Sequence, residues 1–237
     1  MRRGFKRGWM RALLGLVAFW VGQDVYFHTL NPIATRVRQA AAVRMLDKHV
    51  HPIRYGQIPA VFRQAVIATE DRRFWSDPGI DPIGIVRSVV VDVERDGYVE
   101  GGSTLTQQLV DNTLLGKQKT LRRKLLQAWY AIGLYDTMSK QEVFTLYTNV
   151  VYFGHGAYGL YNACETYFGK PPWDCNAGEL TLVAGLPNAP SAYDPLTHYA
   201  LARSRQQVVL ENMVDDGQLS PSQAQAIWRE PIELRAD

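Results

Sequence analysis

The 237-residue chain is long enough for one large globular domain or two small ones and too short for a multidomain enzyme. Its 46% hydrophobic and 21% charged residues exclude a disordered or fibrous protein. The net charge of +3 comes from a tail, because residues 1–11 carry five basic and no acidic side chains. The other 21 basic and 23 acidic side chains leave the body at about −2, which argues against a nucleic-acid-binding protein.

An apolar run follows the basic tail. Residues 12–21 are uncharged and mostly apolar, and Gly22, Gln23 and Asp24 interrupt the run before it resumes. The run is shorter than the roughly 20 residues of a full membrane span, and no small-x-small cleavage site follows it. We therefore expect an uncleaved signal anchor over residues 12–30, with the N-terminus in the cytoplasm and the body outside. The alternative is a buried or interfacial amphipathic helix.

The remainder is predicted to be mainly α-helical, with a juxtamembrane segment over 31–57 and one domain over 58–237. Apolar residues recur at spacings of three and four, the period of a helix with one buried face. No run of alternating strands and no internal repeat is visible in the sequence. The expected helices, in chain order, cover 34–50, 58–70, 83–97, a stretch opening at 104, 121–134, a stretch opening at 139, 165–168, 179–186, 201–214 and 220–228.

The two cysteines, Cys164 and Cys175, do not have the spacing of a metal site, and the histidines are scattered. We therefore predict no protein-bound metal from these residues. An exported body would allow a disulfide between the two cysteines, but both lie in apolar stretches, which favours buried free thiols.

Three local features could carry chemistry. Glu70 and Asp71 leave the apolar face of a predicted helix, which suits a carboxylate with a raised pKa acting as a general base. The alternative for this pair is a solvated helix end with nearby arginines as partners. Segment 101–108 (GGSTLTQQ) places a glycine turn, hydroxyls and amides at a helix N-terminus, where an anion is favoured; the alternative is an ordinary cap. The basic stretch 117–124 could bind phosphate or form an exposed face.

Taken together, the ordered segments resemble the peptidoglycan glycosyltransferases, the family of monofunctional transglycosylases and of the polymerase module of class A penicillin-binding proteins. The resemblance covers about residues 58–217. The matching segments are ATEDRRF (68–74) with Gly79 and Asp81, GGSTLTQQL (101–109), RKL (123–125), Leu146-Tyr147 with Asn149, YFGHGAYG (152–159), YFGK (167–170), AGLPNAP (184–190) and YDP (193–195).

This resemblance implies a mainly α, lysozyme-like glycosyltransferase domain with an N-terminal membrane anchor and a membrane-facing jaw. It implies that the substrate is lipid II and that the 4-hydroxyl of one molecule's GlcNAc joins C1 of the MurNAc on the growing chain. Undecaprenyl pyrophosphate leaves, and the anomeric centre is inverted. The implied partners are lipid II, the growing glycan strand, the membrane, and penicillin-binding transpeptidases or proteins of the divisome or elongasome, but no nucleic acid.

By motif, the resemblance assigns Glu70 as the general base that takes the proton from the acceptor hydroxyl. Negative charge builds on the leaving diphosphate, so cations and hydrogen-bond donors are expected there, with a divalent cation, Mg²⁺ or Mn²⁺, also allowed. The residues expected to bind substrate or diphosphate are Asp71, Phe74, Ser103, Thr104, Gln107, Gln108, Lys119, Arg123 and Lys124.

The chain departs from the family pattern at four positions. Gln127 stands where a second acidic residue is usual, and Asp111 replaces a lysine of the glycine-rich motif. Lys119 replaces an arginine, and Asp77 with Pro78 replaces a histidine before Gly79. Asp111 places a negative charge where a diphosphate is expected to bind. Gln127 removes a carboxylate from the same region.

Three functions stay open at this point. The first is a working but unusual lipid II polymerase. The second is a degenerate homologue that binds lipid II or a cell-wall partner. The third and weakest is a lysozyme-type hydrolase, which would need two placed carboxylates.

Overall fold

The computed structural model describes residues 15, 17–81, 103–116 and 120–235. The described chain is mainly α-helical, which confirms that part of the predicted fold class; the lysozyme-like likeness stays a prediction. Its α-helices are α2 (Ile33–Asp47), α3 (Ala60–Glu70), α5 (Leu105–Thr113), α6 (Leu121–Thr137), α7 (Lys140–Val150), α8 (Leu160–Phe168), α9 (Ala177–Gly185), α10 (Tyr199–Asp215) and α11 (Pro221–Trp228). The predicted tail over 1–11 and the predicted helix over 83–97 lie outside the described residues.

Side-chain caps fix where several helices begin. Thr104 accepts a hydrogen bond from the Gln107 backbone N–H, and the Gln107 side chain returns one to the Thr104 N–H. Ser139 likewise caps α7, and Ser220 caps α11. These caps satisfy backbone N–H groups that have no partner inside the helix. The predicted starts of α5, α7 and α11 are therefore confirmed.

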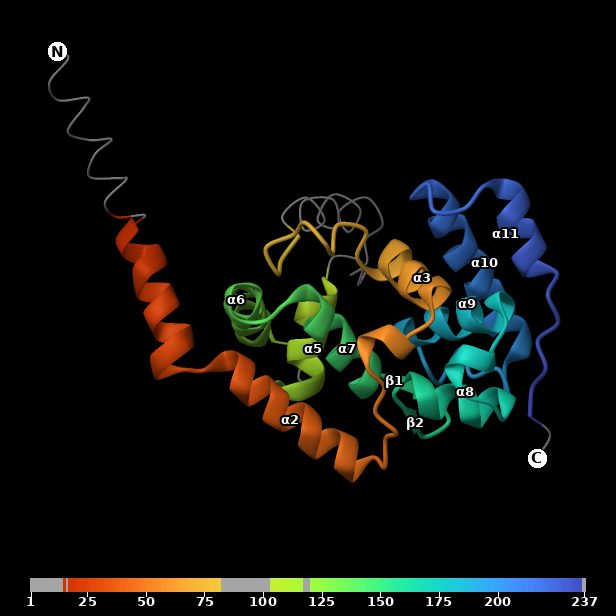
Figure 1. Ribbon diagram of the computed structural model, residues 1–237, viewed down its shortest axis with the longest axis horizontal. Coiled ribbons are helices and arrows are strands. Elements are labelled where there is room, and N and C mark those ends of the chain that lie inside the picture. The colour runs from red at the N-terminus through yellow and green to blue at the C-terminus, as the bar shows by residue number, and fades with distance from the viewer. Residues whose placement is uncertain (1–14, 16, 82–102, 117–119, 236–237) are drawn as a thin grey trace, which may run out of the picture.

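The N-terminal segment projects from the body as a helix (Figure 1). Residues 17–25 are α-helical, and a π-helix follows over Tyr26–Leu30. Within the π-helix Phe27 is buried, and the centroid of its ring lies 5.0 Å from that of Trp129 on α6. In the part of the chain that the structure describes, no helix combines the length and apolar character of a membrane span. The anchor over 12–30 stays a prediction.

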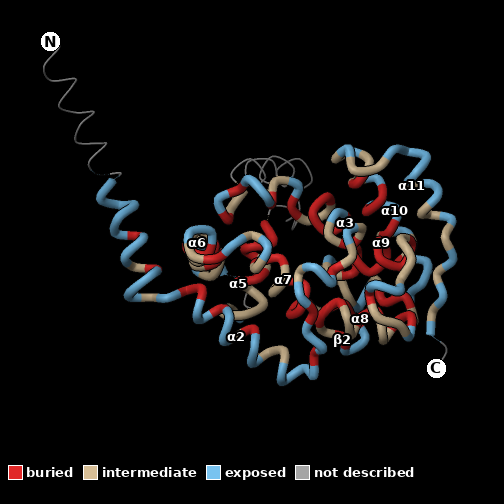
Figure 2. The backbone as a smooth tube through the Cα atoms, viewed as in Figure 1, coloured by how far each residue is buried: buried red, intermediate tan, exposed pale blue. Residues whose placement is uncertain are grey.

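The helices form two packed groups (Figure 1), and hydrogen bonds from the end of α3 to α5 join them. In one group α3 packs against α9 and α10, and α11 packs on α10. In the other, α5 packs against α6 and α7, with α2 along their outer side. Buried residues run through the middle of both groups (Figure 2). The juxtamembrane prediction falls largely on α2, which contributes Ile33, Val37 and Ala41 to the same core.

A small antiparallel hairpin was missed from the sequence. Strand β1 (Tyr152–Gly154) pairs with β2 (Ala157–Tyr158), so that Tyr152 lies opposite Tyr158 and Gly154 opposite Ala157. His155 in the connecting turn has a φ of 48°. Strands of two and three residues are too short to show an alternating pattern, so periodicity could not have revealed them.

Both cysteines are free thiols, as favoured from the sequence. Cys164 on α8 is buried, whereas Cys175 is only partly buried. Burial raises the pKa of the Cys164 thiol well above its usual value, and the Cys175 sulfur beside it adds to this effect.

Gly79 lies close against the backbone of α6. Its φ is 85°, and an added Cβ would lie 2.2 Å from the carbonyl oxygen of Ala131. Its N–H donates to Asp77 at 2.6 Å, and its carbonyl accepts from the Thr104 hydroxyl at 2.7 Å. Only glycine fits this position, because a side chain meets both backbone strain and a fixed carbonyl.

Gly79→Ala is therefore expected to lower the free energy of unfolding by about 2–4 kcal/mol. The matched control is Gly56→Ala, because nothing lies within 4 Å of an added Cβ there. Denaturant unfolding followed by circular dichroism measures both changes. Equal effects of the two substitutions would contradict the close contact at Gly79.

Candidate active site

Glu70 lies at the C-terminal end of α3, where the two groups of helices meet. The helix is held by Phe62, Ala65 and Val66, which are fully buried. The Glu70 side chain is itself only 13% exposed. Gln108 on α5 donates to one carboxylate oxygen at 2.9 Å, and the Arg205 guanidinium on α10 lies 3.7 Å from the other. The carboxylate is thus held from both sides in a fixed orientation.

Asp71, the next residue, joins α3 to α5. Its carboxylate accepts the backbone N–H of Leu105 at 2.9 Å, at the first turn of α5. The residue is buried, and burial together with the charge of Asp77 raises its pKa from 3.8 to about 7. The hydrogen bond from Leu105 and the charge of Lys140 oppose this shift. Asp71 therefore acts as a buried cap that ties the end of α3 to the start of α5.

Tyr147 on α7 lies near Glu70. Burial raises the pKa of its hydroxyl well above the usual value, and the charge of Glu70 adds to this shift. The hydroxyl therefore stays protonated and is a potential donor. It has no hydrogen-bond partner among the described residues.

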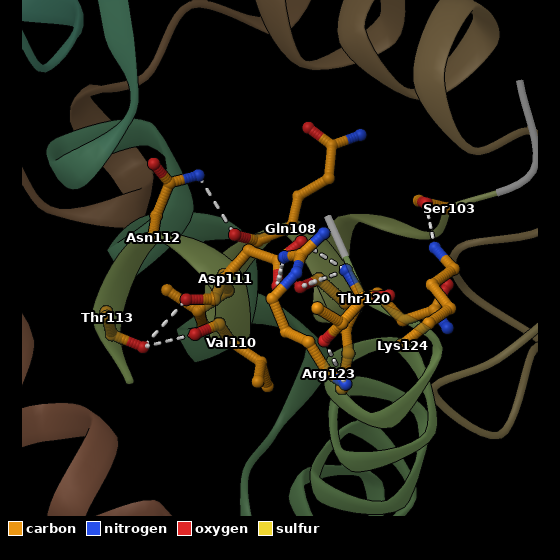
Figure 3. A network of polar contacts seen from close by, with 12 residues as sticks. Ser103, Gln108, Val110, Asp111, Asn112, Thr113, Thr120, Arg123 and Lys124 are labelled. Carbon is orange, nitrogen blue, oxygen red and sulfur yellow. Dashed lines mark hydrogen bonds and ion pairs between the residues drawn. The ribbon is translucent and has the colours of Figure 1, made fainter. Parts of the chain in front are cut away.

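The facing sides of α5 and α6 carry a second polar cluster (Figure 3). Asp111 accepts a hydrogen bond from the Arg123 guanidinium at 2.6 Å, and its other oxygen accepts one from the Gln127 amide. Lys124 donates to the Ser103 hydroxyl at 2.7 Å. Burial raises the pKa of the Asp111 carboxyl, while the charges of Arg123 and Lys124 oppose that rise. The aspartate is thus paired with a cation, which offsets the negative charge that the sequence placed at this site.

The predicted site residues divide into two sets. Glu70 and Gln108 are in direct contact, and Ser103, Arg123 and Lys124 form the partly exposed cluster between α5 and α6. The second set has buried side chains: Phe74 in the core, and Asp71, Thr104 and Gln107 in caps at the start of α5. We assign these four to support of the site. Lys119 lies outside the described residues.

Arg205 and Tyr147 were not expected as site residues. Tyr147 lies in one of the segments that match the family but was given no role, and Arg205 lies in no matching segment. They are brought to Glu70 from 77 and 135 positions away along the chain. Only tertiary packing of α7 and α10 near α3 and α5 places them there. The arginine was visible in the sequence as a charged residue on a predicted helix, but nothing local indicated its partner.

The described residues do not fit the divalent cation that the resemblance allows. No three His, Cys, Asp or Glu side chains gather in a metal-binding group within 17–81, 103–116 and 120–235. Both oxygens of Asp111 are occupied by Arg123 and Gln127, and Gln127 supplies an amide rather than a carboxylate.

The site thus consists of the oriented Glu70 carboxylate and a cluster of one hydroxyl and two cations between α5 and α6, in a helical domain. Comparison with known proteins defines the family. The transglycosylase family profile matches residues 38–214, so the chain belongs to the transglycosylase family. Penicillin-binding protein 1A of Aquifex aeolicus is 40% identical over 181 residues, which cover 76% of this chain and 25% of that protein. A Cupriavidus necator protein provisionally named a transglycosylase is 39% identical over 180 residues, which cover 76% of this chain and 78% of that protein.

Among solved structures, penicillin-binding protein 1A of Haemophilus influenzae superimposes with a TM-score of 0.45 and 20% identity, over 78% of this chain and 18% of that one. The chain spans about a quarter of the length of the penicillin-binding proteins that it matches. The family assignment comes from the sequence matches. They confirm the resemblance found from the ordered motifs.

The raised pKa of Asp71 predicts a specific pH dependence of stability. Because the folded pKa of about 7 exceeds the unfolded value near 3.8, the folded state binds more protons between these values. The free energy of unfolding should therefore fall as pH rises from about 4 to 7. Asp71→Asn keeps an oxygen for the Leu105 N–H and removes the ionisation.

Across that range, the stability of Asp71→Asn relative to the wild type is expected to rise by about 2–4 kcal/mol. Urea unfolding at pH 4, 5, 6 and 7 measures the difference. Asp215→Asn is the control, because that side chain is 68% exposed, and it should follow the wild type. A difference that stays constant with pH would show that Asp71 ionises as an exposed carboxyl does.

Proposed function

We propose that this chain is a peptidoglycan glycosyltransferase that polymerises lipid II into glycan strands and releases undecaprenyl pyrophosphate. Family membership supports the reaction class, and the carboxylate of Glu70 carries the mechanism. Its hydrogen-bond donor is the neutral amide of Gln108, and the Arg205 guanidinium lies 3.7 Å away. Asp71 caps a helix, and Asp111 is paired with Arg123.

Glu70 acts as the general base. It takes the proton from the 4-hydroxyl of the acceptor GlcNAc as that oxygen attacks C1 of the MurNAc on the growing chain. The C1–oxygen bond to the diphosphate breaks, the electron pair leaves with the diphosphate, and attack from the opposite side inverts the anomeric centre. Gln108 and Arg205 hold the carboxylate in place during the attack, which is the condition for efficient proton transfer.

The leaving diphosphate is stabilised by the cluster between α5 and α6. Lys124 and Arg123 supply positive charge, and Ser103 supplies a hydroxyl, near the N-terminal turns of both helices. Helix N-termini and preorganised cations both favour an anion. The Ser103–Lys124 contact is 2.7 Å, so the serine already orients the ammonium group.

We also propose that the domain works at the outer face of the cell membrane, held by the segment over 12–30. A substrate carried on a polyprenyl chain requires a membrane-proximal enzyme. The basic tail over 1–11 supports an N-terminus in the cytoplasm. The growing glycan strand is the second substrate, and a penicillin-binding transpeptidase or a divisome or elongasome protein is the expected partner.

Glu70→Gln tests the function directly, because it keeps the side-chain shape and removes the base. Polymer formation from labelled lipid II in detergent is expected to fall by about 10²–10⁴-fold, while lipid II binding and melting temperature change little. Glu211→Gln is the matched control, since Glu211 lies far along α10 and accepts its hydrogen bond from Gln207. That variant should polymerise like the wild type.

Other outcomes separate the alternatives. A wild-type protein that binds lipid II and makes no polymer would contradict the proposed activity and indicate a binding module. Cleavage of preformed glycan strands by the wild type would indicate a hydrolase. Full activity of Glu70→Gln would remove Glu70 from the mechanism.

A further inference from the structure

Asp111 is the least expected residue of the α5–α6 cluster. Its side chain is 27% exposed and projects from α5 toward α6 (Figure 3). One carboxylate oxygen accepts from Arg123 and the other from Gln127. Two charge-assisted hydrogen bonds of this kind fix the orientation of the groups that donate them.

The partner on α6 is matched to an acid at 111. Gln127 is buried, and its amide nitrogen contacts Asp111 and also the Gln107 carbonyl at 3.4 Å. Its amide oxygen consequently points elsewhere and has no partner within the described chain. A carboxylate at 127 would face the Asp111 carboxylate, and one of the two would have to stay protonated. The glutamine therefore depends on the aspartate, and the two departures from the family pattern form one unit.

Arg123 depends on Asp111 for its orientation. Its side chain is 22% exposed, and its Nε is buried without a hydrogen-bond partner in the described residues. The Nη1 bond to Asp111 is thus the directional contact that the structure shows for this guanidinium. A long, flexible side chain loses considerable rotamer freedom when it binds an anion, and a fixed partner reduces that loss.

We propose that Asp111 is a positioning residue: from α5 it holds the Arg123 guanidinium in the orientation that binds the substrate's diphosphate. Through its hydrogen bond to Gln127, Asp111 places a carboxylate from α5 beside position 127 of α6, where the side chain is an amide. This inference rests on the proposed function for the identity of the anion. Its test is a binding measurement that does not require turnover.

The direction in which Asp111→Asn changes the affinity for a diphosphate distinguishes a positioning role from an effect of charge alone. If Asp111 only adds negative charge near the anion, Asp111→Asn removes a repulsion and should tighten binding. If Asp111 positions Arg123, the same substitution should weaken binding by about tenfold. On an Arg123→Ala background, a positioning residue has nothing left to act on, so Asp111→Asn should then change affinity by less than about twofold.

The experiment measures the dissociation constant of farnesyl pyrophosphate, a soluble lipid diphosphate, for the full chain in detergent. The proteins are the wild type, Asp111→Asn, Arg123→Ala, the double variant and the exposed-carboxylate control Asp215→Asn. Circular dichroism at the assay temperature shows that each is folded. Tighter binding by Asp111→Asn, equal weakening on both backgrounds, or no effect of Arg123→Ala would each overturn the proposal.

A charge exchange provides a second measurement. Asp111→Lys places a cation against Arg123, and Gln127→Glu places a carboxylate against Asp111, so each alone should weaken binding about tenfold. Together they form a lysine–glutamate pair across the same helices, and binding should recover to within about threefold of the wild type. Additive losses in the double variant would contradict the pairing. Lipid II polymerisation by the same wild-type sample reports separately on the proposed function, because diphosphate binding can succeed where turnover fails.

Discussion

The site depends on one hydrogen bond between two helices: the buried Asp71 carboxylate accepts the Leu105 N–H and so joins the end of α3 to the start of α5. Glu70 precedes Asp71, and Gln108 lies one turn into α5, so the same junction brings the Glu70 carboxylate and its hydrogen-bond donor together. The position of Asp71 at this junction disfavours its ionisation, because burial raises its pKa to about 7. Gly79 permits the close approach that keeps this region against α6.

The second constraint is electrostatic. The proposed leaving diphosphate needs positive charge, and the α5–α6 cluster carries two cations, Arg123 and Lys124. Asp111 accepts hydrogen bonds from Arg123 and from Gln127. Net charge cannot reveal such an arrangement, because a body near −2 overall can still present ordered cations at one site. The substitutions that look like losses in the sequence are hydrogen-bonded to each other in the fold.

Much of this could be predicted from the sequence. Apolar spacing and capping pairs located the helices around Glu70, Thr104 and Ser139, because those signals are local. The ordered motifs indicated the family, which the sequence matches confirm, and they assign Glu70 a general-base role that stays a prediction. Tertiary contacts were not accessible: nothing local joins Arg205 to Glu70 or predicts that Gln107 and Phe74 are buried supports. The hairpin around His155 escaped because its strands are too short to have a period.

The most direct test of the account compares kcat for lipid II polymerisation in Asp71→Asn and Asp71→Ala. Asparagine keeps an oxygen for the Leu105 N–H, whereas alanine leaves that donor without a partner and frees α5 from α3. Asp71→Asn is expected to retain most of the wild-type kcat. Asp71→Ala, assayed where it is still folded, is expected to lose at least about tenfold in kcat with little change in KM. Equal kcat values for the two variants would contradict the claim that this junction positions Glu70.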